Sequence, residues 1–406
     1  MGGPTSKVDR VVVAGPLAPF AEGFQARLEE LGYTRLSAVT SMRLMAHLSR
    51  WLSARGLTAG DLTGERVAQY LHERRAAGYA RFLSPRSLAV LLELLGSWGV
   101  LTPQDPPRPC SESEALLALF GDYLLNERAL APSTVQAYVL RARRFLTDCN
   151  PGMTVAGLTA VDVTGAVLGE AGTGSVGSTQ YFVVALRAFL RFCFQQGLVP
   201  VDLSAAALTA TGRRRPGLPR RISRAEATAL LGSCDRRRSP GRRDYAVLLL
   251  LLRLGLRAGE VAGLTLEDLD WRVGEIVVHG KGRRSDRLPL PSDVGEAITA
   301  YLRRGRPRSP RREVFLRAVA PIAPLSRRGI SLVVHRACVR AGVPPVGAHR
   351  LRHTLACDMV RAGVPLPEIG QVLRHRSLAS TAIYARADVD QLRTLAQPWP
   401  NAEAGQ

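Results

Sequence analysis

The chain has 406 residues, enough for two or three domains with cores of their own, and its hydrophobic content of 46% is ordinary for a globular protein. Its formal net charge of +21 is not ordinary, and it favours nucleic acid over an anionic membrane surface as partner. Apolar runs of membrane-spanning length, a secretory signal and paired-cysteine motifs are not found in the sequence. We therefore expect a nucleoid-associated protein of the cytoplasm with reduced cysteines and no membrane partner.

The first part of the chain, to about residue 200, has the pattern of two similar helical units. Residues 39–52 and 133–146 both place apolar side chains and arginines at helical spacing. A Leu-Thr pair then opens the next predicted helix in each unit, at Leu62 and at Leu158. A duplication and two unrelated helical bundles both fit this pattern.

Two linkers are predicted from composition. Residues 101–110 contain four prolines, and residues 211–221 combine proline and glycine with five arginines. The second linker could be a solvated tether or a strap lying on phosphates. These boundaries predict helical domains over 1–108 and 109–210, the first of them a candidate copy of the second.

The pattern changes after the arginine-rich linker. Ser223 and Glu226 have capping-box spacing at a helix start, and the apolar run 244–256 predicts a buried helix that ends near Gly255. Residues 274–291 give the clearest β signal, with two short strands around a Gly-Lys-Gly-Arg-Arg-Ser turn. The arginines expected to contact DNA lie in the linker and in this turn: Arg213, Arg214, Arg215, Arg220, Arg221, Arg283 and Arg284.

The stretch GAHRLRHTLA at 347–356 is predicted to be a helix packed on a core. Positions i, i+3 and i+4 share a helix face, so His349, Arg352 and His353 should lie together. Each feature is weak alone, because paired histidines with an arginine also occur by chance.

Together with Arg257 in a GLR-x-x-E segment, a lysine on the hairpin and a histidine upstream of a tyrosine, this helix resembles the tyrosine recombinases, also called the phage integrase family. The motifs keep the family's order and spacing across about residues 113–395. The resemblance implies six catalytic residues and two supporting ones: Arg257, Lys281, His349, Arg352, His375 and Tyr384, with Glu260 and His353 in support.

The resemblance also implies a fold. It is mainly α with a small β-sheet in the catalytic domain, and it combines helical (SAM-like) core-binding domains with a mixed α/β tyrosine-recombinase catalytic domain over 222–406. Two such domains would form a C-shaped clamp around double-stranded DNA. Family members assemble as homo-tetramers on paired sites, and an accessory directionality protein could take part. The extra residues 1–108 could add a DNA contact or a protein contact.

The family cuts and rejoins DNA through a 3′-phosphotyrosine, so the resemblance implies neither ATP, metal nor any other cofactor. Arginine forks suit phosphate oxygens, His349 is the candidate base and His375 should bind a non-bridging oxygen. Only two of the 55 basic residues are lysine, and the second, Lys281, lies where the family places its general acid. That lysine could also be a remnant of arginine-rich codon usage.

Other tyrosines and other functions also fit parts of the sequence. Tyr245 fits a core position, and Tyr301 lies on a predicted surface helix without a paired histidine, whereas Tyr384 follows Thr381 in the family's Thr-x-x-Tyr context. Arg350 and Arg374 depart from the family pattern, Arg374 standing where glycine is usual, and neither is expected to contact a catalytic residue. The alternatives to a recombinase are a type IB topoisomerase and a DNA-binding protein that does not cleave.

Overall fold

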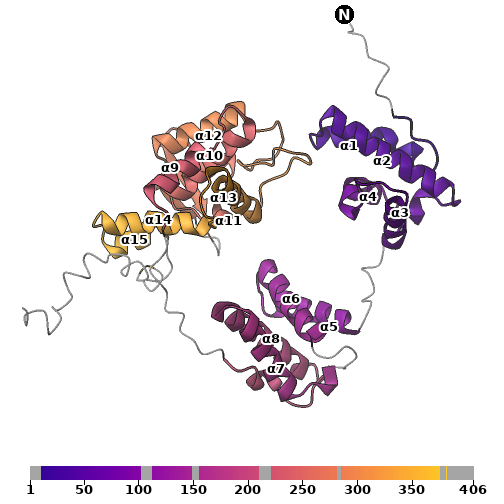
Figure 1. Cartoon of the computed structure of the whole chain (residues 1–406), viewed down its shortest axis with the longest axis horizontal. Helices are drawn as coiled ribbons and strands as arrows, with labels where there is room; N and C mark the ends of the chain where they lie inside the picture. The colour runs from indigo at the N-terminus through magenta and orange to yellow at the C-terminus, as the bar shows by residue number, and fades with distance from the viewer. Residues whose placement is uncertain are drawn as a thin grey trace, which may run out of the picture. The chain divides into compact units, whose positions relative to one another are not determined.

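The computed structural model describes residues 11–101, 112–148, 155–209, 221–280, 285–374 and 381 (Figure 1). The chain divides into two compact units, one formed by residues 1–103 with 217–406 and the other by residues 104–216. Within the described ranges, no helix is both long and apolar enough to cross a membrane. The fold is mainly helical with one small sheet, which confirms the predicted fold class.

The N-terminal helices surround a small core of their own. They are α1 (Ala21–Glu30), α2 (Arg35–Ser53), α3 (Gly64–Ala76) and α4 (Ala89–Ser97). Met45, Leu48 and Leu52 on α2 are fully buried in this core. Thr63 caps α3 by accepting a hydrogen bond from the backbone N–H of Arg66 at 3.3 Å.

The next helices repeat this order around a second core. They are α5 (Glu112–Asp122), α6 (Pro132–Asp148), α7 (Ala160–Thr173) and α8 (Val176–Gln195). Phe120 and Phe189 meet edge to face in the core with ring centroids 5.2 Å apart. Thr159 caps α7, as Thr63 caps α3, and each of these threonines follows a buried leucine.

The C-terminal region holds the remaining helices and the strands. The helices are α9 (Arg224–Gly232), α10 (Ser239–Arg253), α11 (Ala258–Gly263), α12 (Ser292–Arg304), α13 (Arg327–Ala341), α14 (Ala348–Arg361) and α15 (Leu366–Val372). The predicted capping box of α9 is confirmed, since Ser223 and Glu226 exchange hydrogen bonds of 2.6 and 3.1 Å. The predicted buried helix is also confirmed as α10, whose residues 246–251 are all buried.

Helix α10 is the central element of this region. It packs against α12, α13 and α14, and Figure 1 shows these helices grouped around it. Its apolar run is buried because several helices pack around it. The end of α10 and the start of α14 are thereby brought close together.

The sheet has three antiparallel strands in the order β1 (Leu269–Asp270), β2 (Glu275–His279) and β3 (Ser285–Pro289). The two predicted strands are confirmed as β2 and β3, whereas the two-residue strand β1 was not predicted. His279 fixes the turn end of the hairpin, because its Nε2 lies 2.7 Å from the Asp268 carboxylate and its Nδ1 lies 2.8 Å from the Ser285 hydroxyl. The hairpin is therefore anchored just before its turn.

The placement of Tyr301 corrects the sequence analysis. The tyrosine does not lie at the surface of α12: only 1% of it is exposed, and its ring stacks on Phe315 at 5.6 Å. Its hydroxyl oxygen accepts a hydrogen bond of 3.2 Å from the backbone N–H of Leu316. The helical spacing of apolar residues on α12 could have indicated this burial, since Val294 and Ile298 lie on the same helix face as Tyr301.

We expect Tyr301→Phe to lower the free energy of unfolding by about 1–3 kcal/mol, because the buried N–H of Leu316 loses its partner. The half-buried Tyr245 in the same core is the matched control, and Tyr245→Phe should change stability by less than about 0.5 kcal/mol. Urea denaturation of the full chain measures both variants. Equal stability of the two variants would contradict the buried hydrogen bond.

Candidate active site

The structure describes part of the predicted site. It places Arg257, Glu260, His349, Arg352 and His353, whereas Lys281, His375 and Tyr384 lie outside the described residues. Among the arginines predicted to contact DNA, those outside the described residues are Arg213, Arg214, Arg215, Arg220, Arg283 and Arg284. The remaining one, Arg221, forms an ion pair of 3.2 Å with Asp358 on α14.

A turn at Gly255 places Arg257 between α10 and α11. Helix α10 ends at Arg253, and Gly255 then adopts a φ of +57°, which is costly for any residue with a Cβ. A Cβ at this position would also lie 3.0 Å from the side chains of both Leu355 and Leu373. Glycine therefore allows a sharp turn under α14, and the chain starts α11 directly after Arg257.

Glu260 holds Arg257 in place. Its carboxylate accepts hydrogen bonds from the Arg257 backbone N–H at 2.8 Å and from Nη1 at 2.6 Å. The Glu260 side chain is 5% exposed, whereas 44% of the Arg257 side chain is exposed. Burial raises the pKa of Glu260, but the Arg257 N–H and the guanidinium charges of Arg374 and Arg257 outweigh it, so the pKa is lowered overall. Glu260 is thus a buried carboxylate anchor for an exposed guanidinium.

Arg352 is buried beside the turn at Gly255. Only 1% of the residue is exposed, and Nη1 donates to the carbonyl oxygen of Gly255 at 2.5 Å. Nη2 donates to the carbonyl oxygen of Leu373. These bonds join the end of α10, the middle of α14 and the end of α15, because one planar guanidinium reaches two main-chain segments.

The rings of the two histidines of α14 meet edge to face. The His349 and His353 ring centroids are 4.2 Å apart, as expected from their i, i+4 spacing. Partial burial is the main cause that lowers the pKa of His349, although the residue presents much of its surface to solvent, and Arg352, Arg257 and Arg327 lower it further. Burial and the neighbouring His349 lower the pKa of His353 to about 4. Both rings are therefore neutral at pH 7.

Arg374 contacts the site, which corrects the expectation that it would not. Its guanidinium forms an ion pair of 2.7 Å with Glu260, and its carbonyl oxygen accepts a hydrogen bond of 3.3 Å from Nη2 of Arg257. The position of Arg374 directly before the predicted catalytic His375 could have indicated a contact with the site. Its partner Glu260, however, lies 114 positions away in the chain, so no local pattern shows the pair.

Thr381 lies beyond Arg374 on the path to the predicted nucleophile. It is 1% exposed, and a Cβ added to Gly370 on α15 would come within 3.0 Å of its hydroxyl oxygen. Glycine on α15 thus allows the close approach of Thr381. The threonine that precedes Tyr384 by three positions is anchored on the catalytic region.

These groups converge at the ends of α10, α14 and α15. The described part of the site contains the guanidiniums of Arg257, Arg352 and Arg374, one carboxylate and two neutral imidazoles. Such a cluster can bind a phosphodiester, accept a proton and stabilise negative charge. Within the described ranges, no group of three or more metal-ligating side chains is found.

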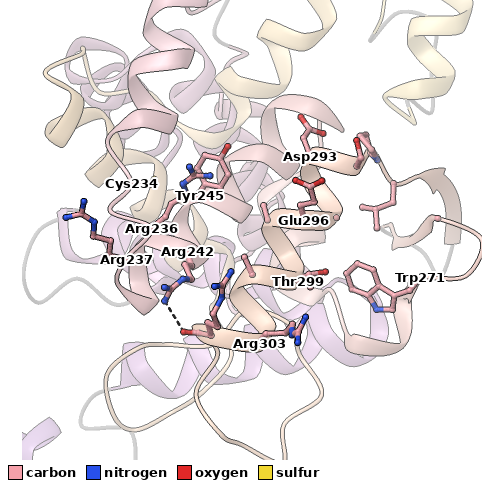
Figure 2. A pocket seen from close by; sticks show the side chains of 18 of the residues that line it. Cys234, Arg236, Arg237, Arg242, Tyr245, Trp271, Asp293, Glu296, Thr299 and Arg303 are labelled. Carbon is pink, nitrogen blue, oxygen red and sulfur yellow. Dashed lines mark hydrogen bonds between the residues drawn. The ribbon is translucent and has the colours of Figure 1, made fainter.

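A cavity of about 1450 Å³ opens elsewhere in the catalytic region, between the start of α10 and α12. Figure 2 shows that its labelled residues carry both signs of charge, with Asp293 and Glu296 on α12 opposite Arg236 and Arg237. The dashed line in Figure 2 marks a hydrogen bond of 3.0 Å from Arg242 to the carbonyl oxygen of Arg304. None of the predicted site residues lines this cavity.

Known proteins resemble most of this chain. The model of the family described as "Phage integrase family" matches residues 220–391. The candidate integrase/recombinase y4rA of Sinorhizobium fredii is 38% identical over 392 residues, which cover 95% of each chain. Tyrosine recombinase XerD of Mycobacterium tuberculosis is 31% identical over 292 residues, which cover 67% of this chain and 93% of the relative.

Solved structures share the fold at low identity. The Tn1549 transposon integrase in complex with a circular intermediate DNA is 16% identical, covers 69% of this chain and 99% of its own, and has a TM-score of 0.54. XerH bound to a palindromic difH substrate is 18% identical, covers 82% of this chain and 94% of its own, and also has a TM-score of 0.54. The family model and the sequence relatives above establish that this chain belongs to the tyrosine recombinase, or phage integrase, family.

Proposed function

We propose that the chain is a site-specific DNA recombinase or integrase that cuts and rejoins strands through a 3′-phosphotyrosine, without metal or ATP. The observation that carries this proposal is the convergence of Arg257, Arg352 and His349 beside the chain segment that leads to His375. Membership of the family supports the same reaction.

In the proposed cleavage step, the phenolic oxygen of Tyr384 attacks a DNA phosphorus. The bond between phosphorus and the tyrosine oxygen forms as the bond to the 5′-oxygen breaks. His349 takes the phenolic proton, for which its lowered pKa keeps it neutral and ready at pH 7. Arg257 and Arg352 stabilise the charge on the non-bridging oxygens, and His375 donates to one of them.

The leaving 5′-oxygen takes a proton from Lys281. An alkoxide is a poor leaving group, and an ammonium can give up a proton whereas a guanidinium cannot. Rejoining reverses the step: a second 5′-hydroxyl attacks the phosphotyrosine and releases the tyrosine. The energy of the phosphodiester bond is kept in the covalent intermediate, so no other energy source is needed.

Binding of the phosphate requires a local rearrangement. Arg352 is 1% exposed, and Nη2 is occupied by the carbonyl oxygen of Leu373. A phosphate oxygen reaches this nitrogen only if the Leu373 carbonyl moves aside. We propose that a phosphate oxygen replaces this carbonyl, so that the Leu373 carbonyl turns aside when the substrate binds.

We propose double-stranded DNA as the partner, bound by a helical core-binding domain over 109–210 and the catalytic domain over 222–406, with 211–221 as an arginine-rich linker. The DNA complexes of the Tn1549 integrase and XerH, which share the fold, support this choice, as does the net charge of +21. A homo-tetramer on paired sites and an accessory directionality protein belong to the same proposal.

Residues 1–108 are proposed as an additional helical domain derived from the core-binding domain. Both regions place four helices in the same order, and in both a Leu-Thr pair starts the third helix with a capping threonine. The fourth helices differ in length, with 9 residues in α4 and 20 in α8. The shared capping residues support a common origin.

The direct test is covalent adduct formation in EDTA with a library of nicked duplexes drawn from the DNA that flanks the gene. The wild type should form an SDS-resistant adduct, and Tyr384→Phe should form none. Lys281→Arg should be slower by about 10²–10⁴-fold, the usual contribution of a general acid. Tyr301→Phe, which alters a core tyrosine, should retain the adduct. Salt-sensitive binding without any adduct would contradict the proposal and favour a DNA-binding protein that does not cleave.

The role of His349 predicts a pH dependence. A base must be neutral to accept a proton, and because the pKa of His349 is lowered, its protonation occurs below the ordinary histidine value of 6.5. The rate of adduct formation at subsaturating DNA should therefore stay flat as the pH falls to about 6.5 and decline only below it. His349→Gln should be slower by about 10²-fold or more and should lose this acid limb. An acid limb retained in His349→Gln would contradict the assignment.

A further inference from the structure

Arg374 occupies a position that does not favour arginine. Its φ is +53°, a left-handed conformation that glycine adopts at little cost and that is uncommon for other residues. The side chain is nevertheless 6% exposed, so the residue is both conformationally constrained and buried. A buried arginine in this conformation requires compensating contacts.

The contacts form a closed circuit around Arg257. The Arg374 guanidinium binds Oε2 of Glu260 at 2.7 Å, and Oε1 of the same carboxylate binds Nη1 of Arg257 at 2.6 Å. Nη2 of Arg257 then donates to the Arg374 carbonyl oxygen at 3.3 Å. Arg374 thus contacts the Arg257 anchor through both its side chain and its main chain.

The same guanidinium also reaches the hairpin. Nε of Arg374 lies 4.0 Å from the carboxylate of Asp286 on β3. Asp286 pairs with Val278 in the register of the hairpin, one position from the His279–Ser285 pair that precedes the turn. Arg374 therefore contacts both the hairpin and Glu260.

We infer that Arg374 is a positioning residue that fastens the β2–β3 hairpin to the Arg257–Glu260 anchor, and so sets where the hairpin presents its general acid. This inference rests on the proposed function, in which the turn of the hairpin carries Lys281. A direct contact of Arg374 with DNA is the alternative, and burial of its side chain by Glu260 and Asp286 argues against it.

Arg374→Gly is the informative variant, because it removes the side chain with its guanidinium while glycine suits the backbone conformation at this position. The variant should therefore fold, and its urea midpoint serves as the control. Adduct formation on an ordinary nicked duplex should slow by about tenfold to a hundredfold, as for a misplaced catalytic group. The salt dependence of DNA binding should be unchanged, since no phosphate contact is lost.

A second substrate separates positioning of the acid from a general structural effect. In a duplex whose scissile 5′-oxygen is replaced by sulfur, the leaving thiolate is stable without a proton, since a thiol has a pKa of about 8.5. On this substrate Arg374→Gly should cleave within about threefold of the wild type. Asp286→Asn should show the same pattern in weaker form, and the double variant should be no slower than Arg374→Gly alone.

Lys281→Ala separates the positioning role of Arg374 from the proposed role of Lys281 as the general acid. If sulfur restores Lys281→Ala but not Arg374→Gly, the positioning role is overturned and the proposed function stands. If sulfur fails to restore Lys281→Ala, the general acid is wrongly assigned and both are overturned. A wild-type rate for Arg374→Gly on the oxygen substrate, or a reduced salt slope, would also overturn the inference.

Discussion

The buried carboxylate of Glu260 is the interaction around which the catalytic region is arranged. A carboxylate that is 5% exposed is stable only with charged or hydrogen-bonded partners, and it takes them from Arg257 and Arg374. These partners come from the turn after α10 and from the segment after α15. The ion pairs of Glu260 therefore join the segment after α10 to the segment after α15 at the proposed active site.

Arg352 complements this anchor with a different kind of partner. Its guanidinium donates hydrogen bonds to the carbonyl oxygens of Gly255 and Leu373. Arg257 and Arg374, by contrast, share the single carboxylate of Glu260. The described cluster thus gathers three guanidiniums and one carboxylate near His349, and guanidiniums suit a phosphate whose negative charge grows during attack.

Local patterns predicted those features that depend on neighbours in sequence. The capping box at Ser223, the buried helix α10, the hairpin and the pairing of the α14 histidines all follow from short-range periodicity or spacing. Features that depend on distant residues were missed. The hydrogen bond between Tyr301 and Leu316 and the contacts of Arg374 with Glu260 and Asp286 join residues that no local pattern connects.

Chasing the covalent intermediate tests the proposed cutting and rejoining through a phosphotyrosine. The adduct formed on a nicked duplex in EDTA is isolated from free DNA and mixed with a duplex that carries a free 5′-hydroxyl and a complementary end. The account predicts a joined strand in an amount equal to the adduct lost, because the phosphotyrosine bond is exchanged for a phosphodiester bond. Release of a strand with a 3′-phosphate and no joined product, or a requirement for metal or ATP, would contradict it.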